Sequence, residues 1–256
     1  MKILTIGDIV GKTGLQKLKE VLPKVIKENE IDFVIVIGEN AADGMGLTEK
    51  MYREILALNV NVVTMGNHTW GKKEIFNFID DKQIIRPANY SKNNPGRGYD
   101  IYECKGKKVG VINLIGRTSM SVLSENPFTV AKEIVSEIKN KVDIIVIDFH
   151  AEATAEKIAL GYFLDGEITI LFGTHTHVQT ADETILEKGT AYITDIGMTG
   201  PSKSVIGMDV GASIKRFETS LPEKYKIAEG KAKFNSCLFE IDDKTNKVTK
   251  ITRINK

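Results

Sequence analysis

Two of the chain's four histidines, His175 and His177, lie two positions apart in the segment FGTHTH, which covers residues 172–177. If the backbone stays extended over these positions, side chains two residues apart project to the same side. Both imidazole rings could then address one small volume. Because imidazole nitrogen is a common metal ligand, this spacing is the starting point of a metal-site hypothesis.

Five apolar segments that we expect to form strands end in a polar residue or pair of residues. In chain order these are Asp8, Glu39 with Asn40, Asn67 with His68, His150, and His175 with His177. In open α/β sheets, ligands bind outside the carboxyl ends of the strands. All four histidines of the chain belong to this set, so we expect them to meet at one edge of the sheet.

Aspartate, glutamate, asparagine and histidine together form a mixed oxygen and nitrogen donor set that suits zinc, manganese or iron. Seven donors are too many for one tetrahedral ion and suit two ions bridged by a carboxylate such as Glu39 or Asp8. Two-metal sites hold their ions roughly 3.5–4 Å apart, lower the pKa of a bound water and clamp both oxygens of an in-line displacement. The positive charge of such a site would attract an anionic phosphate ester.

Each of these residues also fits an ordinary structural role. Asp8 suits a turn or a helix cap, Glu39 and Asn40 suit a cap, and Asn67 tolerates a left-handed turn. A single histidine at a strand end is more often a surface or hydrogen-bonded residue. These separate roles do not explain why every histidine falls at one predicted sheet edge, so we favour a metal site.

The elements that must position these side chains alternate between short apolar runs and segments with helical periodicity. Strands are predicted over 2–7, 33–38 and 60–66, and helices over 15–28, 48–59 and 72–81. A hairpin with Lys105–Lys107 near its turn is predicted over 98–115, followed by helices over 127–140 and 152–163 and strands over 142–149 and 167–173. The last quarter is strand-like over 189–197, 231–242 and 247–254. This rhythm predicts an α/β fold with a mainly parallel sheet and one domain over residues 1–256.

The charge balance argues against a broad basic surface, because Lys and Arg number 35, Asp and Glu number 34, and the net charge is +1. We therefore expect a small-molecule substrate and no stable binding of nucleic acid. No apolar run approaches the roughly 20 residues of a membrane span, so no membrane contact is expected. The N-terminus reads as a strand rather than a signal peptide. Cys104 and Cys237 have no metal or redox spacing, which indicates reduced thiols in a cytoplasmic protein.

At its strand ends the sequence resembles the calcineurin-like metallophosphoesterase superfamily. GNH at residues 66–68 and THTH at 174–177 match its motifs as strings. The superfamily commonly has Asp-x-His first and Gly-Asp second, whereas here Val10 stands where that histidine would be and Glu39 replaces the aspartate. These departures resemble the YmdB branch, as do six strings in order from residue 7 to 201: GDIVGKTG, GENAADGMGLT, TMGNHTW, DFHAEATAEK, GTHTHVQTADE and DIGMTGP.

The resemblance implies a four-layer α-β-β-α sandwich, a homo-oligomer, and hydrolysis of 2′,3′-cyclic nucleotides. It implies that Asp8, Glu39, Asn40 and His177 hold one metal, and that Glu39, Asn67, His150 and His175 hold the second, with Glu39 bridging. Asn40 would coordinate in place of the missing histidine of the first motif. Iron is the metal that the branch suggests, with manganese or magnesium as alternatives.

His68 has no metal in this scheme. A protonated imidazole beside the reacting phosphate can give its proton to the departing alkoxide, and such general acid help is worth about 10²–10⁴-fold. The alternative is a ring that only positions the phosphate.

Two other functions remain open at this point. One is a phosphomonoesterase such as a nucleotidase that uses the same metals, and the other is a regulatory protein that acts through a partner or RNA.

GDIVGKTG is one residue short of a G-x-x-x-x-G-K-[ST] phosphate loop, so we expect Lys12 and Thr13 to open the first helix. Trp70 is expected to support packing, with base stacking as the alternative. Residues 197–200 form either a plain turn or a loop near the substrate.

Overall fold

Two six-stranded sheets form the centre of the computed structural model, which describes residues 1–224 and 226–256. The first has the order β15-β14-β1-β3-β4-β5, with β1 at Lys2–Ile6, β3 at Phe33–Ile37, β4 at Val62–Thr64, β5 at Ile84–Ile85, β14 at Asn235–Ile241 and β15 at Val248–Asn255. The second has the order β10-β11-β9-β8-β7-β6, with β6 at Tyr99–Cys104, β7 at Lys107–Ile115, β8 at Ile144–His150, β9 at Ile170–Thr174, β10 at Thr184–Ile185 and β11 at Ala191–Ile193. The inner strands of both sheets are parallel, and the antiparallel strands lie toward the edges.

A third, three-stranded sheet joins β13 (Ala232–Lys233), β12 (Met198–Pro201) and β2 (Asp8–Ile9). β2 runs parallel to β12, with Asp8 opposite Met198 and Ile9 opposite Thr199. Residues 198–200, for which a plain turn was one prediction, are therefore part of a strand. This small sheet fixes Asp8 just beyond the end of β1.

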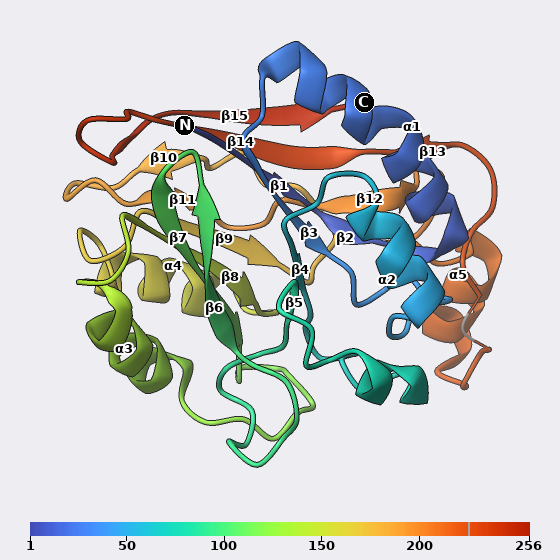
Figure 1. Cartoon of the computed structure of the whole chain (residues 1–256). Helices are drawn as coiled ribbons and strands as arrows, with labels where there is room; N and C mark the ends of the chain where they lie inside the picture. The colour runs from blue at the N-terminus through green and yellow to red at the C-terminus, as the bar shows by residue number, and fades with distance from the viewer. Residues whose placement is uncertain (225) are drawn as a thin grey trace.

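Helices cover the outer face of each six-stranded sheet, which gives four layers in the order α-β-β-α and confirms the predicted fold class (Figure 1). α1 (Gly11–Asn29) and α2 (Glu49–Leu56) pack on the first sheet through a cluster that includes Leu18, Tyr52 and Val36. α3 (Pro127–Ile138) and α4 (Thr154–Phe163) pack on the second sheet through a cluster that includes Ile134, Leu160 and Ile147.

The inner core lies between the two sheets. Along β3, Phe33, Ile35 and Ile37 point into this core, whereas Val34 and Val36 point toward the helices. This alternation follows from the two-residue period of a strand, and because both faces are covered, all five residues are apolar. Each fully buried aromatic or branched aliphatic side chain contributes about 1.5–3 kcal/mol relative to exposure. The sheets are thus a rigid support for the loops at their ends.

Local sequence determines where the helices begin. The Thr48 side chain accepts a hydrogen bond from the Met51 amide and caps α2, and the Asn126 side chain caps α3 in the same way just before Pro127. Both are preferred N-cap residues, and proline is favoured in the first turn. In the hairpin, Lys105 and Gly106 both have positive φ values, 50° and 75°, as a two-residue turn between twisted strands requires.

Two segments differ from the sequence-based expectation. The predicted helix over 72–81 is only a short 3₁₀ helix, η1 (Lys73–Asn77). The segment 201–230, for which no element was predicted, contains α5 (Val210–Thr219), capped by Asp209. Ile214 and Phe217 of α5 are exposed, so its sequence lacks the buried apolar stripe by which the other helices could be recognised.

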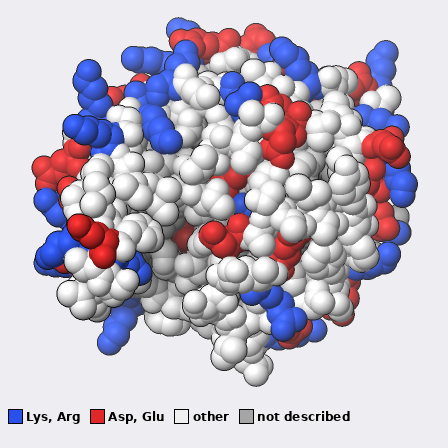
Figure 2. Space-filling view, turned by 180° about the vertical axis from the view of Figure 1, so that it is seen from behind, with Lys and Arg blue, Asp and Glu red and all other residues white. Residues whose placement is uncertain are grey.

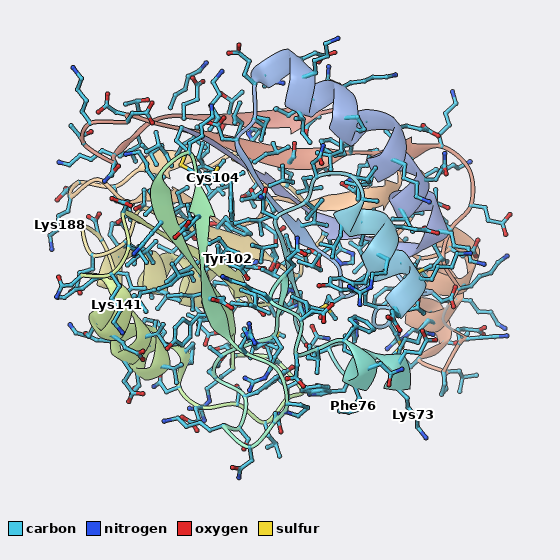
Figure 3. The ribbon with its side chains drawn as sticks, viewed as in Figure 1. Lys73, Phe76, Tyr102, Cys104, Lys141 and Lys188 are labelled. Atoms are coloured by element: carbon cyan, nitrogen blue, oxygen red, sulfur yellow. The ribbon has the colours of Figure 1, made fainter. Side chains whose placement is uncertain are left out.

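The surface carries intermixed charges. On the face seen in Figure 2, lysine and arginine lie mainly around the periphery, and acidic side chains lie both there and nearer the centre. Cys104, labelled in Figure 3 near the end of β6, and the buried Cys237 are both free thiols. Within residues 1–224 and 226–256, no helix combines the length and the apolar character that crossing a membrane requires.

A candidate metal centre at the strand ends

Residues from five segments meet beyond the carboxyl ends of the parallel strands. Glu39 and Asn40 follow β3, Asn67 and His68 follow β4, and His150 is the last residue of β8. His175 and His177 follow β9, and Asp8 begins β2. The structure therefore brings together all eight side chains that sequence analysis placed at this edge.

The tightest group consists of Glu39, His150 and His175, whose potential ligand atoms all lie within 4.8 Å of one another. The Nε2 atom of His150 lies 3.1 Å from Oε1 of Glu39, 2.9 Å from Oδ1 of Asn67 and 3.1 Å from Nδ1 of His175. Four donor atoms thus face one small volume. Nitrogen and oxygen atoms arranged in this way can hold a divalent cation.

A second group lies beside the first and contains Asp8, Asn40 and His177. Nε2 of His177 is 3.8 Å from Oδ1 of Asp8, which is fully buried. Among the residues that the structure describes, neither Oδ1 of Asp8 nor Oδ1 of Asn40 has a hydrogen-bond partner. Leaving a buried polar atom unpaired costs about 1–3 kcal/mol. Each of these two oxygens would gain a partner in a bound cation.

The tautomers of the histidines leave the inward nitrogens free. Nδ1 of His177 is 2.8 Å from the carbonyl of Ile206, which can only accept, so Nδ1 carries the proton and Nε2 keeps its lone pair. Nε2 of His175 is 3.2 Å from a carboxylate oxygen of Glu152, which leaves Nδ1 as the inward atom. Partners of this kind orient metal-binding histidines. Glu152 was missed by sequence analysis, although it lies two residues after His150.

His150 is oriented by a buried chain of side chains. Its Nδ1 is 3.0 Å from the Thr174 hydroxyl, which donates to Oδ1 of Asp148 at 2.8 Å. Because the hydroxyl proton is used toward Asp148, the Thr174 oxygen accepts from Nδ1 of His150. The chain thus directs Nε2 of His150 toward Glu39.

The pKa shifts of Asp8, Glu39 and His175 show how burial and neighbouring charges act on the site. Burial raises the pKa of Asp8. Burial also acts to raise the pKa of Glu39, but the adjacent His150 and His68 outweigh it and keep this pKa below its ordinary value. Burial and the neighbouring charge of His150 lower the pKa of His175 to about 3, so that its ring stays neutral. A bound cation would supply the positive charge that Glu39 otherwise takes from His150.

The extended backbone on which the spacing argument for residues 175–177 depended is not observed. β9 ends at Thr174, and His175 and His177 have positive φ values of 96° and 64°. Such values are uncommon outside glycine, although asparagine, aspartate and histidine adopt them more often than other residues do. The two rings therefore diverge: His175 faces His150 and Glu152, and His177 faces Asp8.

His68 lies at the margin of the donor groups, with its side chain 26% exposed. Its amide donates to Oε2 of Glu39 at 2.7 Å, and its Nδ1 is 3.1 Å from Nδ2 of Asn40.

The glycine before Asn67 is required, since a Cβ on Gly66 would lie 2.4 Å from Cδ2 of His150. The Tyr90 hydroxyl donates to the Gly66 carbonyl at 3.1 Å and so stabilises the turn that carries Asn67 and His68.

Trp70 packs against the core beneath η1. Its ring stacks on Phe76 with centroids 5.5 Å apart and lies 6.4 Å from the Tyr90 ring. The predicted packing role is therefore confirmed. Phe76, labelled in Figure 3, is 56% exposed and covers the outer face of the indole ring.

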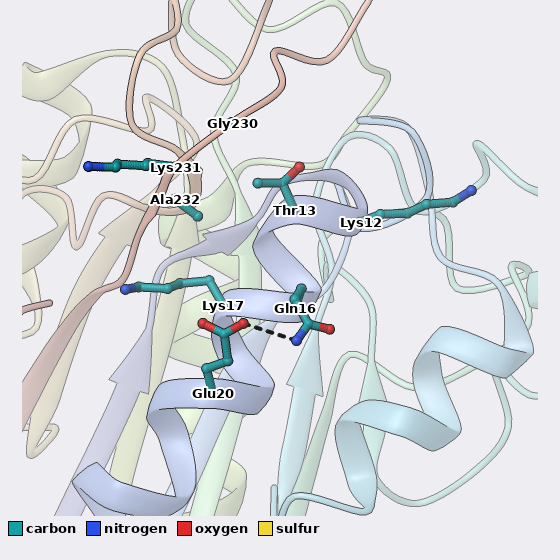
Figure 4. Close-up of a pocket in the computed structure, with 8 residues that line it drawn as sticks. All are labelled: Lys12, Thr13, Gln16, Lys17, Glu20, Gly230, Lys231 and Ala232. Atoms are coloured by element: carbon teal, nitrogen blue, oxygen red, sulfur yellow. Dashed lines mark hydrogen bonds between the residues drawn. The ribbon is translucent and has the colours of Figure 1, made fainter.

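Lys12 and Thr13 lie in the first turn of α1, as predicted, and not in a phosphate loop. They line a cavity of about 630 Å³ on the outer face of α1, together with Gln16, Lys17 and Lys231 (Figure 4). None of the residues lining this cavity belongs to the donor groups at the strand ends. The cavity is therefore separate from the candidate metal ligands.

Comparison with known proteins agrees with this arrangement. A 2′,3′-cyclic-nucleotide 2′-phosphodiesterase of Bacillus subtilis (strain 168) is 51% identical over 255 residues, which are 99% of this chain and 96% of that protein. A crystal structure of a phosphatase from Mycoplasma pneumoniae has a TM-score of 0.95 at 38% identity and covers 100% of this chain and 93% of that one. A protein from Thermus thermophilus has a TM-score of 0.94 at 36% identity, covering 100% of this chain and 99% of that one.

The family model described as YmdB-like protein matches residues 4–254. Together with the donor groups at the strand ends and the whole-chain identity to the Bacillus protein, this match shows that the chain belongs to the YmdB-like family.

Proposed function

We propose that this protein is a metal-dependent phosphoric-ester hydrolase that opens the phosphodiester of 2′,3′-cyclic nucleotides at the 2′ oxygen. The observation that carries the proposal is the meeting of the two donor groups around Glu39, with two buried oxygens that lack partners among the described residues. The name and the 51% identity of the Bacillus relative support the substrate class. The match of the family model over 4–254 supports a single domain over residues 1–256.

The residues present fit two divalent cations. Asp8, Asn40 and His177 would hold one and Asn67, His150 and His175 the other, with Glu39 between them. When bound, two such ions lower the pKa of a water molecule and neutralise charge on the phosphate. We propose iron, with manganese or magnesium as alternatives, because imidazole nitrogens suit iron and carboxylate and amide oxygens suit manganese and magnesium.

His68 is the group that protonates the departing 2′ oxygen. Nδ2 of Asn40 lies 3.1 Å from Nδ1 of His68, so Nε2 is the ring nitrogen that is not engaged with Asn40. In the doubly protonated ring that a general acid requires, Nε2 is the nitrogen that gives the proton, and the side chain is 26% exposed. Hydrolysis adds water across the bond between phosphorus and the 2′ oxygen, which yields the 3′-monophosphate.

A panel of phosphoesters tests the proposal. The purified protein, analysed for metal, is assayed with 2′,3′-cyclic AMP, 3′,5′-cyclic AMP, 3′-AMP and 5′-AMP in the presence of Mn²⁺ and of EDTA. We expect the highest kcat/KM with 2′,3′-cyclic AMP, 3′-AMP as the product, and no turnover in EDTA. Faster release of phosphate from 5′-AMP would favour the phosphomonoesterase instead.

Other expectations from the sequence stay predictions. The homo-oligomer is tested by light scattering of the purified protein, and the cytoplasmic location by cell fractionation. A regulatory role through a partner would be favoured if Asp8→Ala, without metal, still restored the phenotype of a deletion strain.

A further inference from the structure

Lys157 and Asp195 form an ion pair in which both side chains are fully buried, with Nζ 2.8 Å from Oδ2. Burying two charges is costly, and such a pair is often no more stabilising than apolar residues of similar size. Stability alone therefore does not account for it. Neither residue belongs to the donor groups, and neither faces them directly.

The Lys157–Asp195 pair forms hydrogen bonds with the turn that carries His175 and His177. Nζ of Lys157 also donates to the Thr174 carbonyl at 2.8 Å. Oδ2 of Asp195 accepts from the amide and from the hydroxyl of Thr176, at 3.1 and 2.8 Å. The residues before and between the two histidines are thus fixed, in the segment where both histidines have positive φ.

The same carboxylate reaches the strand of Asp8. Oδ1 of Asp195 accepts from the Gly197 amide at 2.8 Å, and the Gly197 carbonyl accepts from the Asp8 amide at 3.1 Å. Gly197 has a φ of 80°, and Gly7 packs so closely that a Cβ there would lie 2.2 Å from the Gly197 carbonyl. One buried carboxylate therefore links the backbone segments of three donor residues.

We propose that Lys157 and Asp195 are positioning residues that hold the 174–177 turn and the Asp8 strand in the geometry that binds metal. This inference rests on the proposed function, because it assigns the pair to the same metal centre. A left-handed conformation at a histidine is unfavourable, and it persists only where surrounding contacts impose it. Without the pair, the turn would relax and the rings of His175 and His177 would leave the site.

The test is Mn²⁺ binding, measured by isothermal titration of metal-free protein, for the wild type and for Lys157→Met and Asp195→Asn. Removing a residue that orients metal ligands typically weakens binding about 10–100-fold, and we expect both variants in this range. Asp165→Asn is the matched control, because Asp165 is also buried and accepts from the Lys188 and Thr190 amides. The control should melt at a lower temperature and bind Mn²⁺ as the wild type does.

A milder pair of variants covers the case in which Lys157→Met or Asp195→Asn fails to fold. Thr176→Val removes only the hydroxyl bond to Asp195 and should weaken Mn²⁺ binding, and Thr176→Ser should restore it. Unchanged Mn²⁺ affinity in every folded variant, with equal loss of melting temperature in Mn²⁺ and in EDTA, would overturn the inference. Failure of the proposed function would give a different result, because the wild type itself would then bind no Mn²⁺ or leave 2′,3′-cyclic AMP intact.

Discussion

Asn40 and His68 are joined by a bond of 3.1 Å between Nδ2 and Nδ1, and the same Nδ2 donates to the Gly44 carbonyl at 3.1 Å. Both protons of the amide are therefore used, and its buried Oδ1 has no hydrogen-bond partner among the described residues. One side chain thus contacts Nδ1 of the neighbouring ring and keeps an oxygen available for the proposed metal ion.

His68→Ala should retain metal and lose turnover. The ring is outside both donor groups, so metal content by elemental analysis should match that of the wild type. The kcat for 2′,3′-cyclic AMP should fall by about 10²–10⁴-fold, which is the usual contribution of a general acid. A substrate whose leaving group needs no proton, bis(p-nitrophenyl) phosphate, should lose less. Equal loss with both substrates would indicate that His68 only positions the phosphate.

Gly66→Ala should damage the metal centre. The added Cβ would lie 2.4 Å from Cδ2 of His150 and 2.6 Å from Oε2 of Glu39, so those two side chains must move apart. Overpacking of this kind costs about 1–3 kcal/mol in unfolding free energy, and Mn²⁺ binding should weaken as well. Gly211→Ala is the control, because a Cβ there would meet only Oδ1 of Asp209 at 3.4 Å. Wild-type Mn²⁺ affinity in Gly66→Ala would contradict the close packing around His150.

Much of this arrangement was predictable, because parallel strands share a direction. β3 and β4 lie in the first sheet and β8 and β9 in the second, so strand direction predicted that the residues after each pair lie together. That the two sets face each other follows from the packing of one sheet on the other. The left-handed conformations of His175 and His177 were not predictable, since they depend on contacts with distant residues such as Asp195.

The buried pair also escaped sequence analysis for a physical reason. Lys157 lies in an amphipathic helix, where a lysine normally points to solvent, and only the packing of α4 on the second sheet buries it. Glu152, by contrast, is half-exposed, and only its contact with His175 distinguishes it from an ordinary residue at the start of a helix. Residues that support a site through tertiary contacts carry no local signal of their own.

Asp182 should contribute to stability in a pH-dependent way. Partial burial acts to raise its pKa, but hydrogen bonds from Thr180 and Thr194 outweigh it and lower the pKa below 3.8. Because the folded-state pKa is the lower one, the stabilisation is present above the unfolded pKa and is lost as the pH falls through the folded value. Urea unfolding of the wild type and of Asp182→Asn at several pH values checks this. The wild type should lose its advantage over the variant on acidification, and a constant difference would contradict the assignment.

Asp8→Asn should separate two effects of Asp8 on stability, namely the cost of burying its carboxylate in metal-free protein and the stabilisation gained when Mn²⁺ binds. In metal-free protein, Oδ1 of Asp8 is a buried carboxylate atom that has no hydrogen-bond partner in residues 1–224 and 226–256, and a neutral amide is cheaper to bury. We therefore expect Asp8→Asn to melt at or above the wild-type temperature in EDTA. With Mn²⁺ at about 100 times its Kd, the wild type gains about 2.7 kcal/mol, and the variant should gain much less. Asp165→Asn, which lies outside the site, should gain as much from Mn²⁺ as the wild type does. An equal gain by Asp8→Asn would show that this carboxylate is not a metal ligand.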